Sequence, residues 1–189
     1  MSLITLPFFS GWRAEQAALA GQSDPLTPEQ QRRLFKKYVC YIEIELFSFC
    51  NRRCWFCPNS SIDRHSENHF LPEELYLNLL QQLADLDFSG QISFSRYNEP
   101  LADKIILKRL CQARATLPKA FLHTNSNGDY LDAQYLQQLQ EAGLDSLSVQ
   151  NYSVEGKSRE ELETLMRARL AQLGLKPEQI CTKSTFTWI

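Results

Sequence analysis

Short runs rich in β-branched and aromatic residues alternate along the chain with longer stretches in which apolar residues recur every three or four positions. The runs predict strands and the longer stretches predict helices, because side chains on one face repeat every two residues in a strand and about every 3.6 in a helix. The predicted strands are Tyr41–Phe47, Gln91–Arg96, Ala120–Thr124, Ser146–Gln150 and Gln179–Trp188. The predicted helices are Pro72–Leu86, Asp103–Thr116, Asp132–Ala142 and Ser158–Leu173.

This alternation of strands and helices indicates parallel strands joined by right-handed crossovers. Consecutive units of this kind curl into an arc, so the predicted fold class is α/β, a partial (β/α) barrel with parallel strands. Functional side chains in such folds lie at the C-terminal ends of the strands. The last predicted strand has no covering helix, which indicates a chain whose C-terminal part is missing or a second chain that completes the sheet.

Two domains are expected. Residues 1–37 form an N-terminal helical preamble or cap, with a short helix at Arg13–Ala20 and another entered at Thr27 and Pro28. Residues 38–189 form the partial barrel.

Two further patterns predict core positions. Cys111 lies beside Leu110 in a helix, and four leucines stripe one face of the first barrel helix: Leu75, Leu79, Leu83 and Leu86.

The first predicted strand has two unlike faces. Ile42, Ile44 and Leu46 share one face, whereas Glu43 and Glu45 share the other. Buried acids destabilise a sheet that is covered on both sides, so this pattern indicates either a polar lumen inside the barrel or acids that are held in structural salt bridges.

The composition indicates what kind of partner to expect. Hydrophobic residues make up 43% of the chain and charged residues 22%, as in ordinary globular proteins. The 20 basic and 22 acidic residues leave a formal charge of −2, so no basic field favours nucleic acid or an anionic membrane. We therefore expect a small-molecule or peptide substrate, with no nucleic acid and no membrane as partner.

The expected compartment is the cytoplasm. No window approaches the roughly 18 uninterrupted apolar residues of a spanning helix, and the first residues lack the basic start and apolar run of a secretion signal. The six cysteines should then be reduced thiols rather than disulfides.

Three cysteines, Cys50, Cys54 and Cys57, stand in a C-x3-C-x2-C pattern directly after the first strand. Three thiolates on one loop can bind three irons of a [4Fe–4S] cubane and leave the fourth iron open to a substrate. The remaining cysteines are scattered. A zinc site made by this triplet with His65 or His69 is the alternative, and surface positions for both histidines are the simpler interpretation of these two residues.

The motif CNRRCWFC, with Phe56 before its last cysteine, resembles the signature of the radical SAM superfamily on the loop after the first strand. ISFSRYNEPLAD resembles the family's glycine-glycine-glutamate segment, with Tyr97 and Asn98 in place of the glycines. HTNSNG and SLSVQNY resemble its third- and fourth-strand segments. The resemblance implies metal binding by Cys50, Cys54 and Cys57. It also implies that SAM binds at Phe56, Asn98, Glu99, Thr124, Asn125, Ser148 and Gln150. Arg64, or else Arg52 or Arg53, could hold the SAM carboxylate, because Arg presents a two-pronged donor.

The implied cofactors are a [4Fe–4S] cluster and S-adenosylmethionine (SAM), which the family cleaves reductively to start radical chemistry. An electron donor such as flavodoxin or ferredoxin is implied as a partner. The substrate and reaction subtype stay open, because no pair of His, Lys or carboxylate residues has the spacing of an identifiable acid–base apparatus, and the catalytic residues are therefore unknown. A non-enzymatic iron–sulfur or zinc-binding module is the alternative function.

Overall fold

The computed structural model describes residues 26–150, 158–172 and 174, and the chain divides into two units, Met1–Tyr38 and Val39–Ile189. The predicted helix Arg13–Ala20 and the predicted strand Gln179–Trp188 lie outside the described residues. None of the helices in the described part of the chain is long and apolar enough to cross a membrane.

In the first unit, helix α2 (Pro28–Tyr38) begins where the sequence predicts. The Thr27 hydroxyl accepts a hydrogen bond from the Gln30 backbone N–H at 3.3 Å, and the Gln30 side-chain oxygen accepts one from the Thr27 N–H at 2.9 Å. This reciprocal pair is a capping box, which satisfies backbone donors that a helix start leaves without partners.

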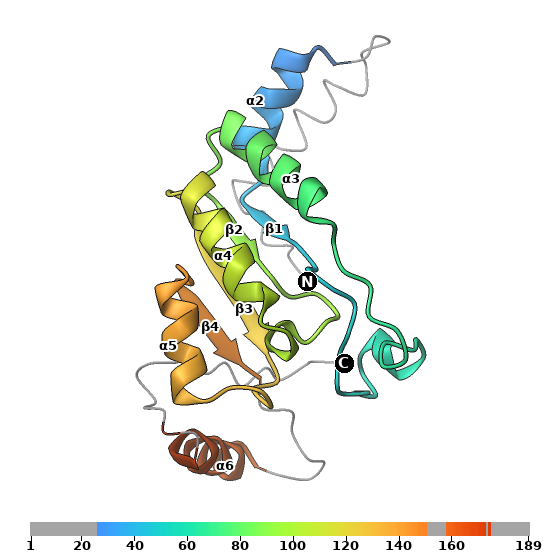
Figure 1. Cartoon of the computed structure of the whole chain (residues 1–189), viewed down its shortest axis with the longest axis vertical. Coiled ribbons are helices and arrows are strands. Elements are labelled where there is room, and N and C mark those ends of the chain that lie inside the picture. Colours follow the sequence, from blue (N-terminus) through green and yellow to red (C-terminus); the bar gives the residue numbers. More distant parts are fainter. Residues whose placement is uncertain (1–25, 151–157, 173, 175–189) are drawn as a thin grey trace, which may run out of the picture. The chain divides into compact units, whose positions relative to one another are not determined.

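The second unit is built on one parallel sheet (Figure 1), which confirms the predicted α/β fold with parallel strands. Its strands follow the order of the sequence: β1 (Tyr41–Glu43), β2 (Gln91–Ser93), β3 (Phe121–Ser126) and β4 (Ser146–Val149). The helices are α3 (Glu73–Asp85), α4 (Ile105–Thr116), α5 (Ala133–Glu141) and α6 (Arg159–Gln172), with short 3-10 turns η1 (Pro58–Ser60) and η2 (Pro100–Ala102).

Strand β1 ends earlier than predicted, at Glu43 rather than Phe47. The Ile44 N–H still donates to the Ser93 carbonyl at 2.8 Å, but Phe47 leaves the sheet and forms an antiparallel bridge with Phe70. Leu46 and Phe47 are buried although they lie beyond the end of the strand. The apolar pattern therefore continues past Glu43, and hydrophobicity alone does not mark the strand end.

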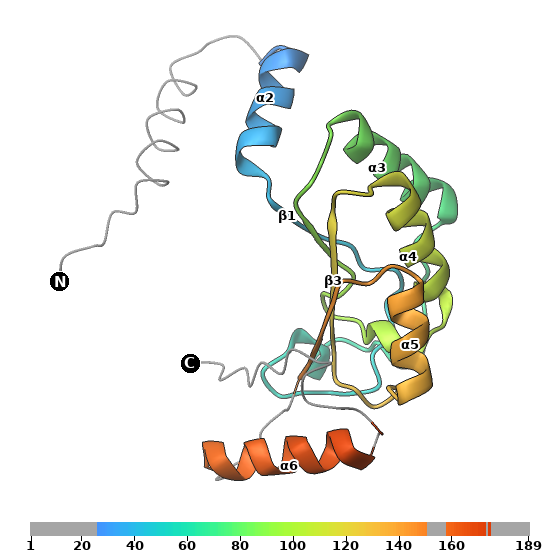
Figure 2. The ribbon, with the colours of Figure 1, turned by 90° about the vertical axis from the view of Figure 1, so that its left-hand side faces the viewer.

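The sheet has one apolar and one polar face. Helices α3, α4 and α5 lie on the same side of the strands (Figure 2), and the side chains of Ile92, Leu122 and Leu147 alternate toward that side. The other side, here called the polar face, carries Glu43, Ser93, Ser95, His123, Asn125 and Ser148. The predicted acids of β1 therefore belong to a surface that is polar across all four strands.

The predicted leucine stripe of α3 is correct at Leu83, which is buried, but wrong by one position at Leu75 and Leu79. Leu75 is 59% exposed, and the buried residues of this helix are Tyr76, Leu80 and Leu83. Tyr76 takes the core position because its ring is fully buried and its hydroxyl donates to the Arg109 carbonyl at 2.7 Å. Leucines on both sides of this face made the periodicity ambiguous.

We expect Leu80→Ala to lower the free energy of unfolding by about 2–5 kcal/mol, because the Leu80 side chain is fully buried and its truncation leaves a cavity in the core. Leu75→Ala is the matched control and should change it by less than about 0.5 kcal/mol. Urea denaturation of both variants measures the difference. Equal losses would restore the predicted stripe.

The prediction that Cys111 is a core residue is also wrong. It is exposed, whereas Ile106, Leu110 and Ala113 form the buried face of α4. Residue 111 follows this face by one position and is turned away from it by the roughly 100° that separates neighbours in a helix.

Candidate functional site

The three predicted cysteine ligands lie on the loop between β1 and η1. Cys50 is buried, and Cys54 and Cys57 are partly exposed. The Cys57 N–H donates to the Cys54 carbonyl at 2.9 Å, and η1 then begins at Pro58. The fixed φ angle of proline suits the first position of a helical turn. The three thiols lie near enough to one another for the charges of Cys50 and Cys57 to act on Cys54, and for that of Cys57 to act on Cys50.

The environment of Cys50 and Cys54 favours their protonated thiols, because the pKa of each is raised. Burial raises the pKa of Cys50 above its ordinary value, against hydrogen bonds from the Arg52 backbone and the Asn59 side chain that lower it. Burial also raises the pKa of Cys54, and the charges of Cys50 and Cys57 act in the same direction. Metals bind thiolates, so iron would displace these protons.

No three His, Cys, Asp or Glu side chains among residues 26–150, 158–172 and 174 converge closely enough to surround a single metal ion. A [4Fe–4S] cluster makes a different demand, because each cysteine binds its own iron. Three reduced, partly buried thiols whose charges influence one another fit this donor set in chemistry and number.

Glu99 stands immediately before η2, on the segment that follows β2, at the centre of a buried network. Its carboxylate accepts hydrogen bonds from the Leu101 N–H at 3.1 Å, the Ser126 hydroxyl at 2.6 Å and the Asn127 N–H at 2.7 Å. Glu99 is 2% exposed, and burial raises its pKa although these donors lower it. The carboxylate thus caps η2 and joins the ends of β2 and β3.

Asn98 is the second predicted residue of this segment. Its side-chain nitrogen is buried and has no hydrogen-bond partner, and the same is true of the side-chain oxygen of Asn59. An unpaired buried polar atom destabilises a protein by about 1–3 kcal/mol, so such atoms are typical of sites that a ligand completes. The Asn59 side chain also donates to the Tyr97 carbonyl at 2.7 Å, which ties this segment to the cysteine loop.

Arg64, the predicted carboxylate ligand, is held from two sides. Its Nη1 atom donates to Glu45 at 2.8 Å and to the Ser48 carbonyl at 3.1 Å. The guanidinium lies 5.4 Å from the centre of the Tyr97 ring. Arg64 is therefore beside the segment that follows β2, and its position is fixed by the loop that leads to Cys50.

The residues predicted on β3 and β4 divide between the two faces of the sheet. Asn125, Ser148 and Gln150 lie together, since Asn125 pairs with Ser148 in register and its oxygen accepts from Gln150 at 3.4 Å. The Asn125 side-chain nitrogen donates to Ser95 at 3.0 Å. Thr124 alternates to the helix-facing side, where its side chain is fully buried.

Phe56 is 41% exposed and meets the Trp55 ring edge-on, with 5.6 Å between ring centres. The histidines of the zinc alternative stay on the loop before α3. His69 pairs with Glu67 at 3.2 Å and is well exposed, and His65 stands edge-on to Phe49.

Asp129 is a site residue that sequence analysis missed. Its carboxylate accepts from Arg52 Nε at 2.7 Å, Arg52 Nη2 at 2.6 Å and Asn51 Nδ2 at 2.9 Å. It also accepts from Arg169 of α6 at 2.8 Å. Asp129 therefore fastens the cysteine loop to the end of β3. The sequence offers two arginines between Cys50 and Cys54 and an acid after Gly128, but nothing in it pairs them.

Gly128 makes this turn possible. Its φ angle is +72°, which glycine adopts readily, and a Cβ atom there would lie 2.8 Å from the Val149 side chain. The Gly128 N–H donates to the Ser126 hydroxyl at 2.9 Å, the same hydroxyl that donates to Glu99. The predicted HTNSNG turn thus connects the Glu99 network with Asp129.

We expect Asp129→Asn to lower the free energy of unfolding by about 1–3 kcal/mol, because the bidentate ion pair with Arg52 is replaced by hydrogen bonding to a single uncharged amide oxygen. Burial raises the pKa of Asp129, but the Arg52 and Asn51 hydrogen bonds outweigh it, so the folded pKa lies below the unfolded value. Wild-type stability from this group is present above the unfolded pKa and is lost as the pH falls through the folded one. The variant should lose this acid dependence, as denaturation between pH 3 and 7 would measure.

Asp85→Asn is the matched control, since Asp85 is an exposed acid that accepts from the Gln81 side chain within α3. The role of Asp129 is contradicted if both variants unfold at the same denaturant concentration at every pH.

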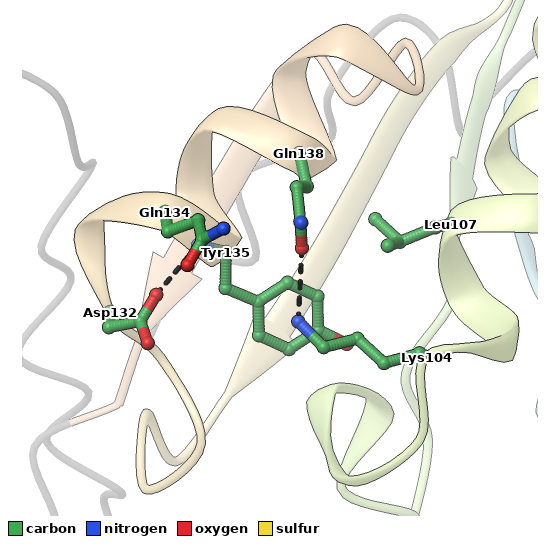
Figure 3. A pocket seen from close by; sticks show the side chains of 6 residues that line it. All are labelled: Lys104, Leu107, Asp132, Gln134, Tyr135 and Gln138. Atoms are coloured by element: carbon green, nitrogen blue, oxygen red, sulfur yellow. Dashed lines mark hydrogen bonds between the residues drawn. The ribbon is translucent and has the colours of Figure 1, made fainter.

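A separate groove lies on the helical side, between α4 and α5 (Figure 3). Three of its polar side chains, those of Lys104, Gln138 and Asp132, are engaged with one another or with the helix backbone. Lys104 stands 3.0 Å from the centre of the Tyr135 ring and donates to Gln138 at 3.1 Å, while Asp132 caps α5 through the Tyr135 N–H. These contacts stabilise the helix pair, and they involve none of the candidate site residues.

The fold and the site define a partial (β/α) barrel whose candidate metal loop follows the first strand and whose buried carboxylate follows the second. Comparison with known proteins identifies the family. Residues 44–172 match the radical SAM superfamily, and the chain belongs to it.

The chain is similar to the S-adenosyl-L-methionine-dependent 2-deoxy-scyllo-inosamine dehydrogenase of Niallia circulans. The identity is 38% over 117 residues, which cover 62% of this chain and 46% of that protein. The crystal structure of BtrN in complex with AdoMet and 2-DOIA has a TM-score of 0.64 and 31% identity, covering 79% of this chain and 58% of BtrN. The chain thus spans about half the length of the relatives it matches.

Native anSMEcpe with bound AdoMet shares the fold alone, with a TM-score of 0.54 at 17% identity over 76% of this chain and 42% of that one. Together these comparisons confirm the predicted family and its partial barrel. The cofactors of this superfamily are a [4Fe–4S] cluster and SAM, as the sequence analysis expected.

Proposed function

We propose that this chain holds a [4Fe–4S] cluster on Cys50, Cys54 and Cys57 and that it is the core of an enzyme that cleaves SAM reductively. The observation that carries the proposal is the group of three reduced thiols at the end of β1, in a chain of the radical SAM superfamily. When bound, the cluster supplies the electron that breaks a carbon–sulfur bond of SAM. Residues 38–189 would form this core, and residues 1–37 its cap.

The residues around the cysteine loop can orient SAM. Glu99 fixes the segment after β2, and the unpaired nitrogen of Asn98 can donate to a carboxylate. Arg64 holds a positive charge beside the same segment. These three residues would therefore hold the amino-acid end of SAM next to the cluster.

The nucleoside end of SAM would lie over the far strands. Asn125, Ser148 and Gln150 present hydroxyl and amide groups suited to a ribose, and Phe56 offers a partly exposed ring for the adenine. Thr124 contributes through its backbone position in β3, because its side chain points toward the helices.

We propose a small polar molecule as the substrate. The relatives of 38% and 31% identity are named for, or crystallised with, small molecules. SuiB bound to the precursor peptide SuiA is only 14% identical and shares the fold alone, with a TM-score of 0.54. The polar face, with Ser93 and His123 in one row, suits hydrogen bonding to such a substrate. We further propose that the chain works in the cytoplasm with a flavodoxin or ferredoxin as electron donor.

Anaerobic reconstitution of the chain with iron and sulfide tests this function. We expect about four irons and four sulfides per chain. SAM together with a reductant should then give 5′-deoxyadenosine, and omission of either should give none. A colourless zinc protein, or a cluster that never cleaves SAM, would instead support the non-enzymatic module.

A further inference from the structure

Glu45 holds the backbone of the segment that follows β2. One oxygen of its carboxylate accepts from the Tyr97 N–H at 2.8 Å and from the Asn98 N–H at 2.8 Å. The same oxygen accepts from Arg64 at 2.8 Å. Two consecutive backbone donors aimed at one charged oxygen restrict the peptide between them to a narrow range of orientations.

The opposite edge of this peptide is held as well. The Tyr97 carbonyl accepts from the side chain of Asn59 at 2.7 Å, and Asn59 lies two residues after the last cysteine. The Glu99 N–H donates to the Phe49 carbonyl at 2.9 Å, next to the first cysteine. The segment from Tyr97 to Glu99 is thus aligned with the cysteine loop on both sides.

Arg64 couples Glu45 to the cysteine loop. Its guanidinium bonds both Glu45 and the Ser48 carbonyl, and its own backbone carbonyl accepts from the Cys50 N–H at 3.3 Å. The Glu45 side chain is 28% exposed and that of Arg64 is 16% exposed, so water screens this pair only in part.

We propose that Glu45 is a positioning residue, which presents the Tyr97–Glu99 segment to the amino-acid end of SAM and thereby sets SAM affinity. The inference rests on the proposed function, since that segment is where we place SAM. Glu45 itself touches neither SAM nor iron. Its effect acts through the two N–H groups, so it depends on the reach of the side chain more than on its charge.

Three substitutions separate reach from charge. Glu45→Gln keeps the length and an oxygen that can accept both N–H groups, but it removes the charge. Glu45→Asp keeps the charge but is one methylene too short to reach both groups. Glu45→Ala removes reach and charge. Glu73→Ala is the matched control, because Glu73 is a partly exposed acid that bonds Lys108 at 2.6 Å on the helical side.

The readout is the SAM dissociation constant of each reconstituted variant, measured through the change that SAM causes in the electron paramagnetic resonance of the reduced cluster. Iron content is measured in parallel. We expect Glu45→Ala and Glu45→Asp to bind SAM about tenfold more weakly, which corresponds to the loss of roughly one net hydrogen bond that holds the segment. Glu45→Gln should stay within about threefold of wild type, and Glu73→Ala should match wild type.

The order of the variants decides the inference. SAM binding by Glu45→Asp that equals or exceeds that of Glu45→Gln would overturn it, because charge rather than reach would then govern affinity. Wild-type affinity in Glu45→Ala would overturn it as well. Should Glu45→Ala fail to assemble iron, the comparison of the Gln and Asp variants still decides. A wild-type chain that assembles iron without responding to SAM would refute the proposed function instead.

Discussion

The chain with Cys54→Ala is expected to lose its [4Fe–4S] cluster and, with it, all SAM cleavage above background. Two thiolates remain on the loop, and they leave two cubane irons without protein ligands. Because burial already favours the protonated thiol of Cys50, the remaining site has little affinity with which to compensate. Iron and sulfide per chain, together with the rate of 5′-deoxyadenosine formation, measure the loss.

Cys111→Ala provides the control for this experiment. Cys111 is an exposed thiol on the outer side of α4, and its removal should leave both iron content and SAM cleavage at wild-type values. Normal SAM cleavage by Cys54→Ala would show that the cysteine loop does not hold the cluster. Equal losses in both variants would point to general damage by cysteine removal.

Glu99→Gln is expected to destabilise the fold by about 1–3 kcal/mol, because the amide NH2 group would face a donor in a buried network that needs two accepting oxygens. The carboxylate now receives three donors, from Leu101, Ser126 and Asn127. An amide has only one accepting oxygen, so at least one donor would meet the NH2 group. Denaturant unfolding of the variant measures the change.

The same variant changes the pH dependence. Burial leaves the folded pKa of Glu99 above its unfolded value, so the native protein retains this proton to a higher pH than the unfolded chain does. The contribution of Glu99 to stability is therefore complete below the unfolded pKa and is lost as the pH rises through the folded one. Glu99→Gln should abolish this decline.

Glu74→Gln, in the exposed first turn of α3, is the control for both measurements and should leave stability unchanged. A Glu99→Gln protein as stable as this control would mean that the network contributes nothing to the fold.

The sequence predicted the frame of the molecule because local signals mark it. Capping at Thr27, the alternation of Ile42 with Glu43 and the cysteine spacing each depend on residues that are close along the chain. Their consequences, a parallel α/β sheet with a cysteine loop after β1, are found in the structure.

The missed features depend on residues far apart in the sequence. Arg52 and Asp129 are 77 positions apart, and Glu45 and Tyr97 are 52 apart. No periodicity reports which of several arginines meets a particular acid. Of the two interpretations of the β1 acids, the structural salt bridges are found, since Glu43 pairs with Arg96 and Glu45 pairs with Arg64.

Side-chain direction was the other limit. Thr124 and Asn125 appear in one motif, yet neighbours in a strand point to opposite faces, and only Asn125 reaches the polar face. In α3, leucines flank the true core face, and the fully buried ring of Tyr76 selects between the two alternatives. Packing against α4 made that selection.

The central claim is that Cys50, Cys54 and Cys57 hold three irons and leave the fourth for SAM. Mössbauer spectroscopy of the chain reconstituted with 57Fe tests it directly, because each iron contributes about one quarter of the signal of a cubane. Addition of SAM should shift about one quarter of the absorption and leave the rest in place. A spectrum in which SAM changes none of the irons, or a chain that takes up no iron at all, would contradict the claim.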